Sequence, residues 1–166
     1  MLFNEYYYSA FRHLDVCNMM LEKLSTMNGK VNLESNRKRL MLDIYYLSGY
    51  VIETMISYSH FVSLGWEKNI NIETYSKYNK GFKTHNLSSK LMFAVSNAHC
   101  DYSGVVLLGV PSSNVIQKRM FKEWSEKVRY QNPKTSSNLD FNEDDLRKYL
   151  SDINQMFKQL RIKYFV

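Results

Sequence analysis

Hydrophobic residues recur along the first 25 positions at spacings that place them on one side of an α-helix. This side consists of Phe3, Tyr7, Ala10, Leu14, Cys17, Leu21 and Leu24. The alternating intervals of four and three residues are typical of an amphipathic helix. Asn28 and Gly29 follow directly, and glycine often supplies the left-handed conformation in which a helix ends. The pattern therefore predicts a helix from Phe3 to the Asn28-Gly29 pair.

Residues 35 to 64 predict a longer helix that is buried around much of its circumference. Its two neighbouring apolar stripes are Leu40, Ile44, Leu47, Val51, Met55 and Met41, Tyr45, Ser48, Ile52, Ile56. A stripe this wide indicates the central helix of a bundle. Gly49 interrupts it, at a cost of about 1 kcal/mol relative to alanine. We expect the close approach of a neighbouring helix at Gly49 to offset that cost, and Gly65 to end the helix.

The middle of the chain predicts one further helix and two irregular segments. Residues 66–84 are rich in Asn, Lys and Tyr and predict a solvated loop with one helical turn within 72–78. Leu87, Leu91, Ala94 and Ala98 then form one stripe, capped by Thr84, His85 or Asn86. The apolar run within 103–111 is interpreted as a loop packed on the bundle, with a lone strand as the alternative.

Two more helices complete the pattern. Pro111-Ser112-Ser113 is a helix-start signal, and Ile116, Met120, Phe121, Trp124 and Val128 continue one face as far as Arg129-Tyr130. After a loop at 134–138, the last helix begins with an acidic turn at Asn142–Asp145 and ends with Arg161 and Lys163. Its core positions are Leu146, Leu150, Ile153, Phe157 and Leu160. The sequence thus predicts an all-α fold, an up-and-down bundle of four to five helices.

Length and composition agree with this fold and exclude several classes. The 166 residues suit a single domain, residues 1–166, and six Gly and two Pro are too few for an all-β sandwich. Two cysteines are too few for a disulfide scaffold or a four-cysteine zinc site. The N-terminus lacks a secretory signal, and Asp43, Glu53 and His60 interrupt the apolar stretch at 40–66. We therefore expect a cytoplasmic protein that does not enter a membrane.

The charge balance and the missing motifs say little about a reaction. A net charge of +6 attracts polyanions, but most of the 22 basic residues are lysines, which also suit a plain soluble surface. The chain has no glycine-rich phosphate loop and no Gly-x-Ser-x-Gly elbow. Its four histidines are far apart, and the adjacent His99-Cys100-Asp101 side chains would diverge on a helix. We expect neither a metal ion nor a cofactor.

One polar group on the central helix carries more information. Tyr46, Gly49, Tyr50 and Glu53 are spaced so that two hydroxyls, a notch and a carboxylate share one side of a buried helix. A buried carboxylate needs a donor or a cation, for which His85 and Arg129 are the candidates. One interpretation is a structural network that fixes helix register. The other is a cleft for a nucleotide or RNA phosphate, with Arg129 as its clamp and a tyrosine ring stacked on a base.

Three segments in this order resemble the HEPN family, the prokaryotic and eukaryotic nucleotide-binding helical domains. They are Tyr45–Glu53, His85-Asn86-Leu87 and Trp124–Tyr130, and the resemblance extends from about Asp15 to Pro133. It implies an up-and-down helical bundle, a homodimer formed through the long helices, and association with nucleotides or RNA. Family branches include ribonuclease toxins, phage-defence proteins and partners of a minimal nucleotidyltransferase.

The chain departs from the ribonuclease branches of this family at one position. Those branches carry an Arg followed, after four to six residues, by a His. None of the seven arginines here is followed by a histidine at that distance. The resemblance therefore implies a non-catalytic HEPN-like module that dimerises, associates with nucleotide or RNA, and serves a defence or toxin–antitoxin-type system. The nucleotide- or RNA-binding candidates are Tyr46, Tyr50, Glu53, His85, Arg129 and Tyr130.

Two alternatives stay open at this point. The first is a ribonuclease or nucleotide-processing enzyme with a different site, such as Glu53 acting with His85. The second is a protein-interaction partner of a minimal nucleotidyltransferase, with the 66–84 segment as its docking face.

Overall fold

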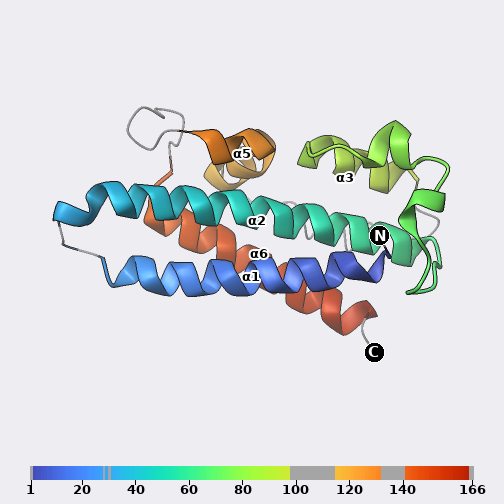
Figure 1. Cartoon of the computed structure of the whole chain (residues 1–166), viewed down its shortest axis with the longest axis horizontal. Coiled ribbons are helices and arrows are strands. Elements are labelled where there is room, and N and C mark those ends of the chain that lie inside the picture. Colours follow the sequence, from blue (N-terminus) through green and yellow to red (C-terminus); the bar gives the residue numbers. More distant parts are fainter. Residues whose placement is uncertain (1, 28, 30, 98–114, 132–140, 165–166) are drawn as a thin grey trace.

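The computed structural model describes residues 2–27, 29, 31–97, 115–131 and 141–164, and these residues form an all-helical bundle (Figure 1). Its α-helices are α1 (Asn4–Ser25), α2 (Glu34–Ser63), α3 (Leu87–Ser96), α5 (Val115–Glu123) and α6 (Glu143–Tyr164). The antiparallel helices α1 and α2 form one layer, α6 crosses behind them, and α3 and α5 lie along the other side of α2. The predicted all-α class is confirmed.

Of the two glycines predicted to end long helices, Gly65 lies at the end of α2, and Gly29 lies beyond the end of α1. A short 3-10 turn, Val31–Leu33, leads from the first helix into the second. Gly29 and Gly65 have φ values of +75° and +71°, the left-handed conformation that side chains other than glycine rarely adopt. Gly65 directly follows Leu64, the C-cap of α2, and terminates that helix, whereas α1 already ends at Ser25, four residues before Gly29.

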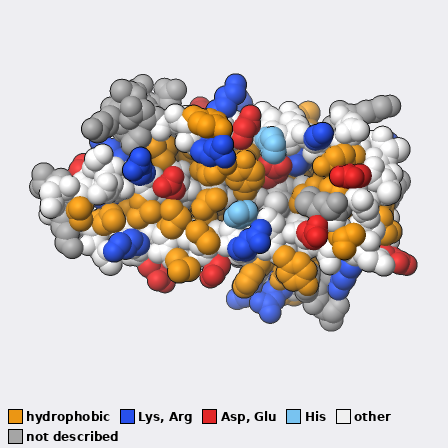
Figure 2. Space-filling model, in the orientation of Figure 1, with side chains coloured by type: hydrophobic (Ala, Val, Ile, Leu, Met, Phe, Trp, Pro, Cys, Tyr) orange, Lys and Arg blue, Asp and Glu red, His pale blue; other side chains and the backbone are white. Residues whose placement is uncertain are grey.

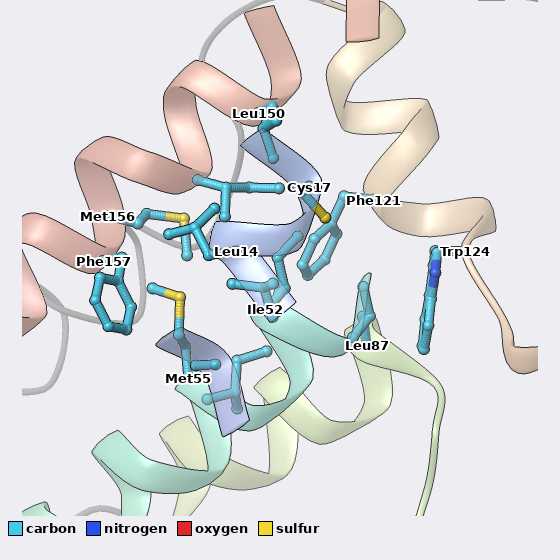
Figure 3. Packing of buried hydrophobic residues seen from close by; sticks show 14 of the residues in the cluster. Leu14, Cys17, Ile52, Met55, Leu87, Phe121, Trp124, Leu150, Met156 and Phe157 are labelled. Carbon is cyan, nitrogen blue, oxygen red and sulfur yellow. The ribbon is translucent and has the colours of Figure 1, made fainter. Parts of the chain in front are cut away.

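The core is built around the C-terminal half of α2, where residues 51–61 are all buried. Leu14 and Cys17 of α1, Ile52 and Met55 of α2, and Phe157 of α6 belong to the same packed cluster (Figure 3). Burial raises the pKa of the Cys17 thiol to about 12, so this cysteine serves as a small apolar core residue. The wide stripe of α2 thus identified the central helix correctly.

The connection between α2 and α3 is more ordered than a solvated loop. It contains two helical turns, Ile72–Thr74 and Tyr78–Phe82, instead of the single turn predicted within 72–78. Ile72 and Phe82 are each 1% exposed, and the ring of His60 stacks on Phe82 with 4.9 Å between centroids. Side chains of this segment therefore close the end of the core, which the polar composition of the segment does not reveal.

The predicted helix through residue 130 is interrupted. Helix α5 ends at Glu123, Ser125 is extended, and a separate 3-10 turn runs over Glu126–Tyr130. At the break, Trp124 turns toward α2, and its indole Nε1 donates a hydrogen bond to the Tyr46 carbonyl oxygen at 3.1 Å. A tertiary contact thus overrides an amphipathic pattern that continues to Val128.

Several predictions fall outside the described residues. They are the loop or strand within 103–111, the helix start at Pro111-Ser112-Ser113, the 134–138 loop and the His99-Cys100-Asp101 group. Within the described ranges, no helix has an apolar stretch that could cross a membrane. Their histidine, cysteine and acidic side chains form no group of three that could hold a metal ion.

An ion-pair cluster fixes the start of α6. Glu143 is 8% exposed and accepts hydrogen bonds from Arg37 of α2 and Arg147 of α6, and Arg147 also reaches the Ser25 hydroxyl of α1. Burial alone would raise the pKa of Glu143, but the hydrogen bonds from Arg37 and Arg147 outweigh it and lower that pKa. One carboxylate therefore ties the ends of three helices together.

We expect Glu143→Gln to lower the free energy of unfolding at pH 7 by about 2 kcal/mol, the range for hydrogen bonds to charged groups. Because the folded-state pKa of Glu143 is depressed, its stabilising contribution is present above the ordinary glutamate pKa. The contribution is lost as the pH falls through the folded-state value. Urea unfolding of both proteins between pH 7 and pH 3 should show the difference shrinking in acid. A constant difference would contradict this role.

Candidate functional site

Glu53 lies in the middle of the buried half of α2 and is 8% exposed. Its Oε1 accepts a hydrogen bond from Nζ of Lys90 at 2.9 Å, and its Oε2 lies 3.0 Å from Nδ1 of His85. Both partners come from the beginning of α3 or from the residues just before it. The carboxylate is therefore sequestered and compensated, as the sequence predicts, and His85 is one of its partners.

The cation that compensates Glu53 is Lys90, and not Arg129 as the sequence suggested. Lys90 is 3% exposed, and its Nζ also lies 3.5 Å from the Ser57 hydroxyl and 5.1 Å from the centroid of the Phe82 ring. Burial lowers the pKa of Lys90, and the charge of Glu53 opposes that effect. Lys90 lies three residues after Leu87 and four before Ala94. A lysine on the apolar face of a helix is the signal that sequence reasoning missed.

His85 connects this buried pair to the surface. Asn86 caps α3, accepting a hydrogen bond from the Ser89 amide at 2.8 Å, which fixes the backbone next to His85. The His85 side chain is 51% exposed. Because a carboxylate only accepts hydrogen bonds, Nδ1 is the donor to Glu53, and Nε2 of the neutral ring is left as an acceptor. The structure thus holds an exposed imidazole in one orientation.

Aromatic side chains of α2 extend the site beside His85. The Tyr50 ring lies edge-on between the rings of His85 and Trp124, with centroid distances of 6.2 and 5.2 Å. The hydroxyls of Tyr46 and Tyr50 are hydrogen-bonded at 3.2 Å. Burial, followed by this hydrogen bond, raises the pKa of Tyr50. Tyr50 therefore presents an uncharged hydroxyl near neutral pH.

Gly49 provides the notch that these contacts require. A Cβ atom at Gly49 would overlap with the Cε2, Nε1 and Cδ2 atoms of the Trp124 indole. The sequence predicts a close approach at Gly49, but by a neighbouring helix. The structure shows one indole ring instead, from the residue two positions before the turn that carries Arg129 and Tyr130.

Arg129 and Tyr130 lie at the exposed end of the site. The Arg129 guanidinium is 4.8 Å from the centroid of the Tyr130 ring, donates to the Tyr130 hydroxyl, and interacts with the Tyr46 hydroxyl. These hydrogen bonds, the one to Tyr130 first, raise the pKa of Arg129. Tyr130 is 73% exposed. Both side chains are therefore open to a ligand.

The six candidate residues form one continuous set of contacts, which we call the polar-aromatic surface. It runs in the order Glu53, His85, Tyr50, Tyr46, Arg129 and Tyr130. On the face shown in Figure 2, hydrophobic side chains gather over the middle of α2, with basic, acidic and histidine side chains among them. A fixed imidazole, an arginine and tyrosine rings can together bind a phosphate and stack on a base.

Comparisons with family models, with curated proteins and with solved structures find no match for this chain. The HEPN resemblance therefore stays a prediction.

Proposed function

We propose that the polar-aromatic surface binds a nucleotide or single-stranded RNA without cleaving it. The observation that carries the proposal is the exposed Arg129–Tyr130 pair beside the Tyr46 hydroxyl. A guanidinium binds phosphate through two parallel hydrogen bonds, and an exposed tyrosine ring stacks on a base of any sequence. The fixed ring of His85 offers a further hydrogen bond to a sugar or base.

The buried pair of Glu53 and Lys90 supports the same proposal. Because Lys90 already compensates Glu53, the carboxylate can orient His85 without needing a cation from the ligand side. The net charge of +6 favours the approach of a polyanion. The buried pair thus holds the site in shape, and the exposed residues make the contacts.

The family assignment, the homodimer and the biological setting belong to the same proposal. The order of the three motifs supports a HEPN-like cytoplasmic module that dimerises and serves a defence or toxin–antitoxin-type system. A minimal nucleotidyltransferase is the alternative partner. A small nucleotidyltransferase reading frame adjacent to this gene would favour that alternative over free RNA binding.

Arg129→Ala should weaken RNA binding by about tenfold or more, because a charge-assisted contact to phosphate is lost. Its effect on the melting temperature should be small, since Arg129 is exposed and does not pair with Glu53. Filter binding of short single-stranded RNAs at about 50 and 200 mM salt measures both affinity and salt dependence. Arg161→Ala removes the same charge from an exposed position on α6 and is the matched control.

If Arg129→Ala and Arg161→Ala lowered the affinity for RNA equally, RNA binding would depend only on net charge. Binding that is absent at low salt, or independent of salt, would remove RNA from the proposal.

An enzyme is the second candidate function, favoured by the 3.0 Å contact between His85 Nδ1 and the Glu53 carboxylate. A carboxylate that orients an exposed imidazole is a common arrangement for a general base. End-labelled RNA, recovered after incubation, distinguishes the two candidates. Intact RNA supports the binding module, whereas cleavage that disappears in His85→Gln would favour the enzyme.

A further inference from the structure

Helix α1 carries an apolar stripe on the side that faces away from the bundle. Tyr8, Phe11 and Met19 are 57%, 53% and 62% exposed. Phe11 leans toward α6, where its ring lies 6.1 Å from that of Phe157, while Tyr8 and Met19 stay on the outer line of the helix. In Figure 1 no described helix covers this side of α1. Exposed large side chains concentrated on one helix are typical of an interaction surface.

Arg12 and Asp15 lie between Tyr8 and Met19 on the same outward side. The positions 8, 12, 15 and 19 follow helical spacing, so all four side chains share one face. No salt bridge is found for Arg12 or Asp15 among the described residues. Opposite charges therefore stand at the centre of the stripe, with apolar side chains at both ends.

This arrangement is self-complementary in an antiparallel pair of helices. Suppose that two copies of α1 are related by a two-fold axis that passes between His13 and Leu14. Each residue of one copy then lies at the same height along the helix pair as the residue of the other copy that is equally far from this midpoint on the opposite side. Arg12 then meets Asp15 of the second copy, and Tyr8 meets Met19 of the second copy. Each contact occurs twice, as an isologous interface requires. Toward the ends, Glu5 lies at the same height as Glu22 of the second copy, but these two carboxylates are on opposite edges of the interface. Lys23, one residue further along, is on the same edge as Glu5 of the second copy.

We propose that the outward face of α1 is a homodimer interface, in which two copies pack antiparallel about His13 and Leu14. This inference rests on the homodimer proposed above and names its surface. The polar-aromatic surface does not include the stripe. One helix from each chain buries less area than an obligate dimer needs, so we expect a dissociation constant on the order of 10 µM.

Sedimentation velocity on the full chain between about 2 and 200 µM tests the interface through its concentration dependence. The wild-type mass should rise from one chain toward two. Arg12→Asp places two acidic residues opposite each other, and Asp15→Arg places two arginines opposite each other. Each single reversal should weaken the dimer at least tenfold. Arg161→Asp, an equal charge reversal on α6, should have no effect.

Mixing the two single variants provides the decisive comparison. An Arg12→Asp chain and an Asp15→Arg chain are complementary to each other, so the mixture should restore a dimer that neither chain forms alone. This result cannot arise from a folding defect. If neither charge reversal affected dimer formation, the α1 interface would be wrong, although the homodimer itself would stand. A chain that stays monomeric at all concentrations would overturn both, while filter binding still tests the RNA proposal separately.

Discussion

Replacing Gly49 with alanine should destabilise the protein by about 3 kcal/mol, although alanine favours helix more than glycine does. The reason is that the new Cβ would occupy the position of the Trp124 indole, which is 1% exposed. The indole cannot shift without losing its hydrogen bond to the Tyr46 carbonyl oxygen and its contact with Tyr50. For a chain of this size, that loss corresponds to a fall in melting temperature of about 10 °C.

Thermal unfolding followed by circular dichroism measures this effect. Ser35→Ala, at an exposed position in the first turn of the same helix, should change stability by less than about 0.5 kcal/mol. The variant Trp124→Leu removes the ring that causes the clash. Adding Gly49→Ala to this variant should therefore lower its stability only slightly further. Additive losses in the double variant would contradict the close contact between Gly49 and Trp124.

Lys90→Met should destabilise the protein by about 3–5 kcal/mol, because it leaves the Glu53 carboxylate buried with only His85 as its partner. Adding Glu53→Gln removes the uncompensated charge. The double variant should therefore be more stable than Lys90→Met alone by about 2 kcal/mol or more. Lys83→Met, an equal change at an exposed position, is the matched control.

Chemical denaturation of the wild type, Lys90→Met, Glu53→Gln, the double variant and the Lys83→Met control at one pH gives the comparison. The losses in unfolding free energy caused by Lys90→Met and by Glu53→Gln should be strongly non-additive if the two side chains form a buried pair. If the double variant were less stable than the wild type by the sum of the two single losses, the pairing of Glu53 with Lys90 would be wrong.

The helices could be predicted because their signals are local. The spacing of apolar residues identifies α1, α2 and α6, and Gly65 marks where α2 ends. The break at Trp124 could not be predicted, since the residues on both sides continue the same helical pattern. Only the notch at Gly49, 75 residues earlier, explains why the chain turns there.

The candidate site was predicted in part for a related reason. The burial of Glu53 follows from its place on a wide apolar stripe. Its contact with His85 follows because a buried carboxylate needs a hydrogen-bond donor or a cation. Which cation reaches Glu53 depends on how α3 and the turn at 126–130 pack on α2, and periodicity does not report that packing. Lys90 reaches Glu53 from α3, while Arg129 stays at the surface beside Tyr130.

The central claim is that the buried pair holds an exposed His85 in a surface that binds RNA. Two-dimensional proton–nitrogen NMR of the histidine rings at pH 8 tests it, with His85→Gln used for assignment. We expect His85 to carry its proton on Nδ1 and its signals to shift as a short single-stranded RNA is added, while those of the buried His60 stay unchanged. A proton on Nε2, or His85 signals that stay unchanged with saturating RNA, would contradict it.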